Sequence, residues 1–157
     1  MSDKIKKLII VLCIVVFILA VDLTTKKVLD NKEMQVINGV VSFLSEHNYG
    51  AAWSFLSGKV VLLIAISVVF LVVFIVFDIV EKQTKLLYTI SFAMIVGGTL
   101  GNMIDRIFLG YVRDFINLEF MSFPVFNFAD CCLVVGVILY CIYFVFMWGK
   151  GEEKKSE

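Results

Sequence analysis

Two aspartates in the C-terminal half of the chain, Asp114 and Asp130, are the residues best suited to catalysis. Two carboxylates held close together share a proton, because both cannot ionise cheaply, so one acts as a base and the other as an acid. Such a pair can activate a water molecule against an amide carbonyl and then protonate the leaving nitrogen. Structural explanations also exist. Asp130 follows Asn127 by three residues, as at a helix N-terminus, and Asp114 is adjacent to a possible salt-bridge partner, Arg113.

Further polar residues have the spacing of neighbours on a helix. Asn102, Asp105 and Arg106 share a face at i, i+3 and i+4. A pair between Asp105 and Arg106 would keep the carboxylate ionised, which favours a structural or substrate-orienting role for the group. Asp22 and Lys26 lie four residues apart and can pair along the end of another helix. Supporting a site and anchoring the helix at a membrane interface fit this pair equally well.

Other chemistries find little support. His47 is the only histidine, which excludes a His-rich metal site, and Ser54 has no base at helical spacing. Lys plus Arg equals Asp plus Glu, with 14 of each and no basic stripe, so a nucleic-acid partner is not expected. The four cysteines lie in apolar runs and are expected to be small buried residues: Cys13, Cys131, Cys132 and Cys141.

The composition is that of a membrane protein: 61% of the 157 residues are hydrophobic. Four apolar stretches approach the roughly 20 residues that a bilayer-spanning helix needs. We place the spans at about 5–25, 59–78, 86–105 and 127–148, within one domain over 1–157. The first stretch also resembles a cleavable signal peptide, but no small-x-small site follows it. Gly97 and Gly101 form a GxxxG step that predicts close helix packing.

The basic residues predict the orientation of these spans. Eight of the 14 Lys and Arg lie in the N-terminal tail, the loop at 81–85 and the C-terminal tail, all of them short segments. Such a bias places both termini in the cytoplasm. Nearly all other ionisable and amide groups then fall at the extracytoplasmic face, and only Asp78 sits at the opposite end of a span. Charged groups near hydrocarbon are costly, so this collection predicts a functional site.

The two outer loops are expected to cover that site. Residues 34–44 read as a β-hairpin turning at Asn38-Gly39 and lying on the membrane. Residues 51–56, with Trp53, place aromatic rings at the interface, and 115–126 form a second aromatic-rich segment. The predicted fold is therefore an all-α integral membrane protein with four transmembrane helices, a small extracytoplasmic β-hairpin or sheet and an amphipathic loop.

Five motifs in order resemble those of the lipoprotein signal peptidases, the type II signal peptidases of bacteria. The resemblance spans essentially the whole chain, and several ordered motifs together are far more specific than any one. One departure is Leu23, where the family usually has Gln after the first Asp. The motifs are Asp22-Leu23-Thr24-Thr25-Lys26, Asn48-Tyr49-Gly50-Ala51-Ala52-Trp53-Ser54, the run 97–106 (GGTLGNMIDR), Val112-Arg113-Asp114-Phe115-Ile116 and Phe126-Asn127-Phe128-Ala129-Asp130.

The resemblance implies an intramembrane aspartyl endopeptidase that needs neither a metal nor an organic cofactor. It would cut prolipoproteins before a diacylglyceryl-modified cysteine, in a bacterial cytoplasmic membrane, in contact with membrane lipid, and would be sensitive to the cyclic peptide globomycin. The family's catalytic pair falls on Asp114 and Asp130. Its supporting residues fall on Asp22, Lys26, Asn48, Gly98, Asn102, Asp105, Arg106, Asn127 and Ala129.

A different class of function competes with this one. Acids in membrane helices also serve as relays in proton- or ion-coupled transporters. Such a protein should place its acids near the bilayer midplane, on discontinuous spans. The depth of Asp114 and Asp130 in the structure therefore discriminates between the two classes.

Overall fold

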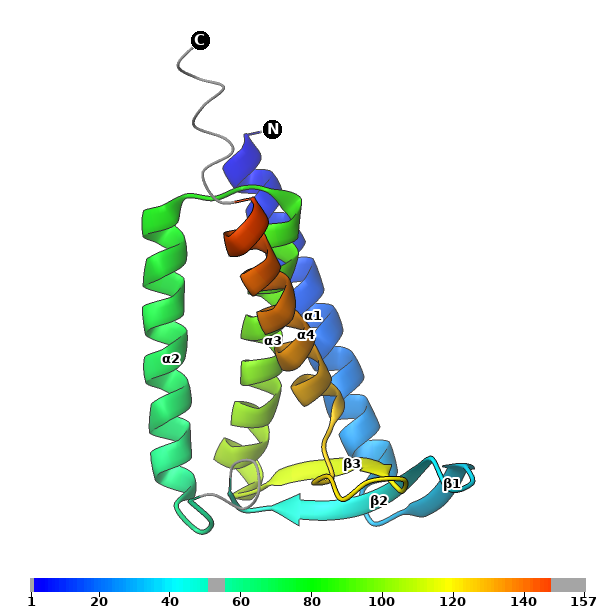
Figure 1. Cartoon of the computed structure of the whole chain (residues 1–157). Helices are drawn as coiled ribbons and strands as arrows, with labels where there is room; N and C mark the ends of the chain where they lie inside the picture. The colour runs from blue at the N-terminus through cyan, green and yellow to red at the C-terminus, as the bar shows by residue number, and fades with distance from the viewer. Residues whose placement is uncertain (1, 51–55, 148–157) are drawn as a thin grey trace.

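Four long helices carry the apolar runs of the sequence (Figure 1). The computed structural model describes residues 2–50 and 56–147, so Trp53, Ser54 and the C-terminal tail from 148 onward lie outside the described residues. The helices are α1 (Asp3–Leu29), α2 (Val60–Glu81), α3 (Leu86–Leu109) and α4 (Phe128–Phe146). All four are long and apolar enough to cross a membrane, which confirms the four predicted spans.

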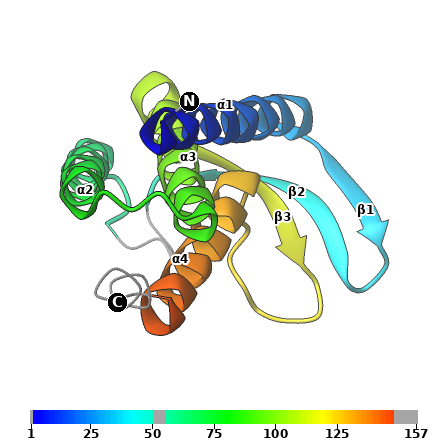
Figure 2. The same ribbon diagram turned by 90° about the horizontal axis from the view of Figure 1, so that it is seen from above.

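Helix α3 forms the centre of the bundle. In the most apolar 18-residue stretch of each helix, 61% of α3 is buried, against 11% of α1, 11% of α2 and 22% of α4. It packs against both α1 and α4, whereas α2 stands apart and contacts mainly α3 (Figure 2). Three of the polar residues predicted for the site, Asn102, Asp105 and Arg106, therefore sit on the one helix that has protein on most sides.

Local sequence explains where the helices begin and end. Helix α4 begins at a capping box, in which the Asn127 side chain accepts from the Asp130 backbone and the Asp130 side chain accepts from the Asn127 backbone. Helix α3 ends at Gly110, whose φ of 81° is the left-handed conformation that glycine adopts without strain. Helix α1 continues to Leu29, beyond the predicted end near residue 25, and its C-terminal part buries Asp22 and Lys26 inside the bundle.

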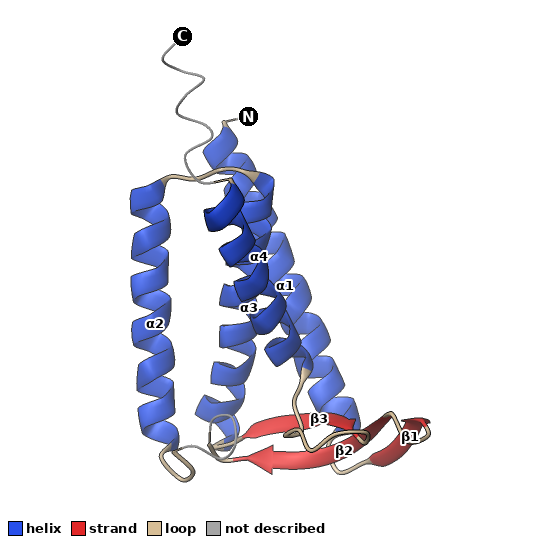
Figure 3. Cartoon of the chain, viewed as in Figure 1, coloured by secondary structure: helices blue, strands red, loops and turns tan. Residues whose placement is uncertain are grey.

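A three-stranded antiparallel sheet closes one end of the bundle (Figure 3). It consists of β1 (Glu33–Ile37), β2 (Val41–Asn48) and β3 (Val112–Leu118), in that spatial order. The predicted hairpin is confirmed as β1 and β2, with Gly39 at a φ of 71° in the turn. The third strand was missed, because residues 115–126 were interpreted only as an aromatic-rich segment.

The expectation that the cysteines are buried was wrong for two of the four. Cys132 is buried and Cys131 is partly buried, but Cys13 and Cys141 are exposed on the apolar outer surface. An apolar run indicates a membrane helix without saying which of its faces meets protein. Most of α1 and α4 faces outward, where lipid takes the place of a protein core.

The end of the bundle opposite the sheet holds a smaller polar cluster among aromatic rings. Lys7 of α1 forms an ion pair with Asp78 of α2, with side chains 12% and 15% exposed. The Tyr143 hydroxyl of α4 donates to Oε1 of Gln83 at 2.7 Å. Tyr143 also belongs to a buried core with Leu71, Tyr88, Phe92 and Val96. These contacts connect all four helices near the termini.

Candidate active site

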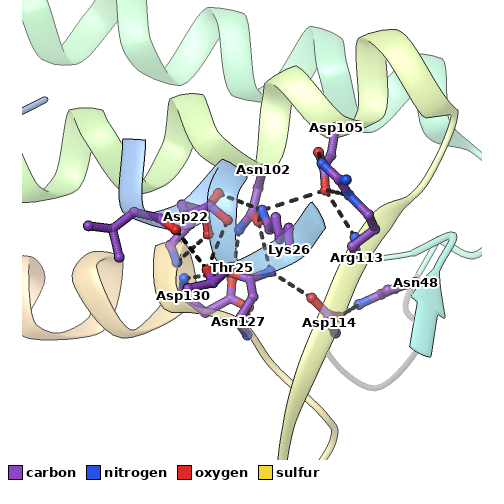
Figure 4. Close-up of polar contacts among 12 residues, drawn as sticks. Asp22, Thr25, Lys26, Asn48, Asn102, Asp105, Arg113, Asp114, Asn127 and Asp130 are labelled. Atoms are coloured by element: carbon purple, nitrogen blue, oxygen red, sulfur yellow. Dashed lines mark hydrogen bonds and ion pairs between the residues drawn. The ribbon is translucent and has the colours of Figure 1, made fainter. Parts of the chain in front are cut away.

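Three helix ends and two strands meet at the sheet end of the bundle, and their polar side chains point toward one another (Figure 4). The polar side chains come from the C-terminal parts of α1 and α3, from the start of α4 and from the strands β2 and β3. The residues that converge are Asp22, Lys26, Asn48, Asn102, Asp105, Asp114, Asn127 and Asp130.

Asn127 links the two candidate catalytic carboxylates. Its Nδ2 donates to Oδ1 of Asp114 at 2.6 Å, and its backbone N–H donates to Oδ2 of Asp130 at 3.1 Å. The same Nδ2 also donates to Oδ1 of Asn102 at 3.0 Å. Asn127 is fully buried, so these hydrogen bonds are made without competition from bulk water. One side chain thus caps α4 and aligns β3 with it.

Asp114 is a buried carboxylate that forms no ion pair with any of the residues that the structure describes. It is 3% exposed, and its Oδ2 accepts from Nδ2 of Asn48 at 3.0 Å. Burial, together with the nearby charge of Asp130, raises the pKa of Asp114 to about 7, although the hydrogen bonds from Asn48 and Asn127 oppose the shift. A carboxyl group with this pKa holds a proton about half the time at neutral pH, which is what a general acid needs.

Asp130 lies beside Asp114 but in a more accessible position. Its Oδ1 accepts from Nδ2 of Asn102 at 2.7 Å, and its side chain is only partly buried. It is in the first turn of α4, where the helix dipole favours negative charge. The helix-capping explanation for Asp130 is therefore correct, and it holds together with a position inside the polar cluster.

Lys26 holds the adjacent part of the cluster together. Its Nζ lies 2.8 Å from Oδ2 of Asp22 and 3.7 Å from Oδ2 of Asp105, and it donates to Oδ1 of Asn102 at 3.0 Å. Lys26 and Asp22 are fully buried, so their role as an interfacial anchor is excluded. Removing charges from water is costly, and this arrangement repays the cost by surrounding one ammonium with two carboxylates.

The expected pair between Asp105 and Arg106 does not form. Asp105 instead binds Arg113, which donates through Nη2 at 2.7 Å, Nε at 3.2 Å and its backbone N–H at 3.1 Å. Consecutive residues on a helix point in different directions, so the sequence neighbours cannot face each other. Arg106 donates to the backbone oxygen of Gly50 at 2.9 Å, and its Nε is a buried atom without a partner among the described residues.

The proposed surface salt bridge between Arg113 and Asp114 is also wrong. Neighbouring residues on a strand point to opposite faces of the sheet, so Arg113 reaches α3 while Asp114 reaches α4. Arg113 is the supporting residue that sequence reasoning missed. Gly110 could have revealed its pairing with Asp105 in the sequence. A glycine turn after α3 returns the chain directly to the helix end that carries Asp105.

Small residues allow the helices to approach closely at the site. A Cβ on Gly98 would lie 2.5 Å from the backbone oxygen of Ala129, and a Cβ on Gly101 would lie 2.6 Å from Oδ2 of Asp22. The backbone N–H of Ala129 in turn donates to Oδ1 of Asp22 at 2.9 Å. The packing interpretation of the GxxxG step is confirmed, since Gly97 also faces α1, at Ile18.

The remaining groups are arranged differently. His47 pairs with Asp30 at 3.0 Å and stacks on Tyr111, away from the two carboxylates. Within residues 2–50 and 56–147, no group of three or more His, Cys, Asp or Glu side chains is placed to hold a metal ion. What the arrangement offers is a pair of carboxylates, one with a pKa near neutrality, oriented by amide side chains.

Fold and site together define a multispan membrane protein with an acidic polar centre at one end of its helices, and not at their midpoint. Comparison with known proteins gives the particular family. Residues 14–146 match the family described as Signal peptidase (SPase) II. The chain belongs to this family, the membrane aspartic peptidases that remove signal peptides from prolipoproteins. Membership of this family favours a peptidase over the proton- or ion-coupled transporter that the sequence left as an alternative.

Individual relatives agree over most of the chain. It is 45% identical to the lipoprotein signal peptidase of Lactiplantibacillus plantarum over 107 residues, covering 68% of this chain and 71% of the relative. It is 37% identical to that of Enterococcus faecalis over 134 residues, covering 85% and 83%. A bacterial membrane enzyme solved by the in meso method superimposes with a TM-score of 0.81 and 34% identity, covering 86% of this chain and 87% of that one.

Proposed function

We propose that Asp114 and Asp130 are the catalytic pair of this peptidase, and that the scissile amide of the prolipoprotein binds between them. The observation that carries the proposal is that buried Asn127 donates hydrogen bonds to both carboxylates, through Nδ2 to Asp114 and through its backbone N–H to Asp130. A capping residue alone needs only its contact with the backbone of Asp130. The additional bond to a strand distant in sequence has the effect of holding two acids close together.

The two acids take different parts in the reaction. Asp130, which is the more accessible, removes a proton from water, and the oxygen attacks the carbonyl carbon. The carbon–nitrogen bond then breaks while Asp114 transfers its proton to the leaving nitrogen. The raised pKa of Asp114, about 7, supports this assignment because the acid is still protonated near neutral pH. The proton taken up by Asp130 then passes to Asp114, which returns both carboxyl groups to their starting state before the next cycle.

The supporting residues hold this geometry. Asn48 orients Asp114, and Asn102 orients Asp130. Lys26, Asp22 and Asp105 fix the position of Asn102 and the start of α4. Gly98 and Ala129 keep α3 and α4 in close contact, and Arg106 fixes the backbone after β2 at Gly50.

We further infer that the substrate is cut before its diacylglyceryl-modified cysteine, at the extracytoplasmic surface of the cytoplasmic membrane. A lipidated cysteine presents its amide at headgroup depth, and the carboxylates lie where the helices end and the sheet begins. Short lysine-bearing segments at the opposite end favour a cytoplasmic location for the termini. Membrane lipid and the cyclic peptide globomycin are expected to contact the same face.

Cysteine labelling tests the orientation. We expect Asn38→Cys, in the turn between β1 and β2, to react with a membrane-impermeant maleimide in intact cells. Ser2→Cys should react only after lysis. The opposite pattern would overturn the orientation without affecting the assignment of the catalytic pair.

Amide substitutions test the catalytic pair. Asp114→Asn and Asp130→Asn preserve size and each removes one titratable group, so we expect each to lower the rate of prolipoprotein cleavage about 10³-fold or more. Asp30→Asn is the matched control, because Asp30 lies at the same end of the bundle but contacts His47 and Ser45. Cleavage of a lipidated substrate at near wild-type rate by either test variant, with normal membrane insertion, would refute the proposal.

A further inference from the structure

A groove runs between α1, α2 and α3 at the end of the bundle that carries the N-terminus. Its volume is about 510 Å³. Its walls are mostly apolar, with Leu8 and Val11 from α1, Ile75 from α2 and Val96 from α3 among the lining residues. Helix α2, which forms one wall, stands apart from the other three helices in the ribbon (Figure 1). It lies at the opposite end of the molecule from Asp114 and Asp130.

The end of the groove nearest the termini is positively charged. Lys4, Lys7 and Lys82 line it together with a single acid, Asp78. Asp78 is already paired with Lys7. Among the residues that the structure describes, neither Lys4 nor Lys82 forms an ion pair, and both are exposed. Two ammonium groups from different helices are therefore available to an anion at this position.

The conformation of Lys82 points to a use for its side chain. Lys82 caps α2 with φ 52° and ψ 22°, the left-handed conformation that glycine adopts at lower cost than any other residue. Its backbone N–H donates to the oxygen of Asp78 at 3.2 Å, which completes the cap. The cap explains the backbone conformation but gives no reason for a long cationic side chain. That side chain extends the charged rim of the groove from α1 to α2.

We propose that this groove binds an anionic phospholipid, with the phosphate between Lys4 and Lys82 and an acyl chain along the apolar walls. Basic pockets between membrane helices are recognised sites for anionic headgroups. The apolar walls favour a phospholipid over free phosphate, and the net positive rim favours an anionic lipid over a zwitterionic one. A bound lipid would fill the space between α1 and α2 and so stabilise the helix with the fewest contacts. The site is independent of the catalytic assignment.

Native mass spectrometry of the full chain tests the charge requirement. The purified protein in detergent micelles is titrated with dioleoylphosphatidylglycerol, dioleoylphosphatidylcholine or inorganic phosphate, and bound adducts are counted. We expect a saturable phosphatidylglycerol site, weak phosphatidylcholine binding and no phosphate adduct. In Lys4→Gln/Lys82→Gln the affinity for phosphatidylglycerol should fall about 30-fold, since each lysine near an anionic lipid contributes about fivefold.

The matched control removes the same charge from the same two helices at their other ends. Lys27→Gln/Lys59→Gln changes exposed lysines of α1 and at the start of α2, so we expect its phosphatidylglycerol affinity to stay within twofold of the wild type. Equal losses in both double variants would show general charge attraction and overturn the site. An undiminished affinity in Lys4→Gln/Lys82→Gln would overturn it as well.

A second pair of variants tests the acyl-chain part of the groove. Leu8→Trp fills the groove without changing charge, and Leu8 is 57% exposed, so the larger ring displaces no core residue. Val16→Trp is the control on α1, since Val16 is 64% exposed and does not line the groove. We expect only Leu8→Trp to weaken phosphatidylglycerol binding. Equal affinities in the two variants would contradict an acyl chain in the groove.

Discussion

The two ends of the bundle both place charged side chains among apolar ones, but they differ in how those charges are balanced. Near the termini, one ammonium, Lys7, meets one carboxylate, Asp78. At the sheet end, Lys26 and Arg113 together bind Asp22 and Asp105. Within the described residues, the other two acids of that cluster form no ion pair.

The unpaired acids are Asp114 and Asp130, and amide groups take the place of cations around them. Asn48, Asn102 and Asn127 donate hydrogen bonds that orient the carboxylates. An amide fixes the direction of a carboxylate without supplying the full positive charge that would keep it ionised. Four ion-paired residues therefore form a structural frame for the site: Asp22, Lys26, Asp105 and Arg113. Asp114 and Asp130, which amide groups orient, can still exchange protons.

The frame is tested by removing its central cation. Lys26→Met leaves Asp22 buried without a counterion, so we expect the free energy of unfolding to fall by about 3–5 kcal/mol. Detergent-induced unfolding in micelles measures this change. Lys27→Met is the matched control, because Lys27 is exposed and forms no ion pair with any of the described residues. If the two variants are equally stable, Lys26 is not the central support of the cluster.

The side-chain amide of Asn127 bridges Asp114 and Asn102, and this bridge is tested by a substitution that keeps the helix cap. Serine caps helices about as well as asparagine, so Asn127→Ser should preserve the melting temperature to within a few degrees. It cannot reach both Asp114 and Asn102, and we expect cleavage of a lipidated prolipoprotein to fall about 100-fold, the effect of losing one well-placed donor. Wild-type cleavage by a stable Asn127→Ser protein would separate the bridge from catalysis.

The titration of Asp114 predicts a pH dependence. If its protonated form is required, the cleavage rate is highest below pH 7 and falls about tenfold per unit well above the pKa of about 7. Asn48→Ala removes a hydrogen bond that lowers the pKa of Asp114, so the alkaline fall should move to higher pH. Rate profiles of the two proteins between pH 6 and roughly 9 measure the shift. A shift to lower pH would contradict the assignment of Asp114 as the acid.

The same shift affects folding with a definite sign. The pKa of Asp114 rises from 3.8 to about 7 on folding, so the folded state binds more protons between these values. The contribution of Asp114 to stability is therefore fully present below pH 4 or so and is lost as the pH rises through about 7. Asp114→Asn should remove this component from the pH dependence of unfolding in micelles.

The sequence was informative about the elements and less informative about which side chains meet. Apolar runs predicted all four spans, and the Asn38-Gly39 turn predicted the hairpin. The pairing of Asp105 with Arg113 was not predictable from helical spacing, because it depends on where β3 returns after Gly110. Strand β3 contains a single aromatic residue, Phe115, and overlaps the aromatic-rich segment 115–126, which reads equally well as a membrane-surface loop. Both features depend on contacts between different elements: Asp105 with Arg113 across the Gly110 turn, and β3 with β2 in the sheet.

The smallest expected effect belongs to a single contact at the end near the termini, where Tyr143 of α4 meets Gln83 in the loop after α2. Tyr143→Phe removes the hydroxyl that donates to Gln83, so we expect a loss of about 1 kcal/mol in the free energy of unfolding. Gln83 is partly exposed, and water can replace the lost partner. Prolipoprotein cleavage should be unchanged, because Tyr143 is at the far end of α4 from Asp130.

Tyr49→Phe, in a side chain 49% exposed, provides the control for stability. A loss of cleavage in folded Tyr143→Phe would mean that the two ends are coupled, and the division between a frame and a reactive centre would then extend along the whole bundle.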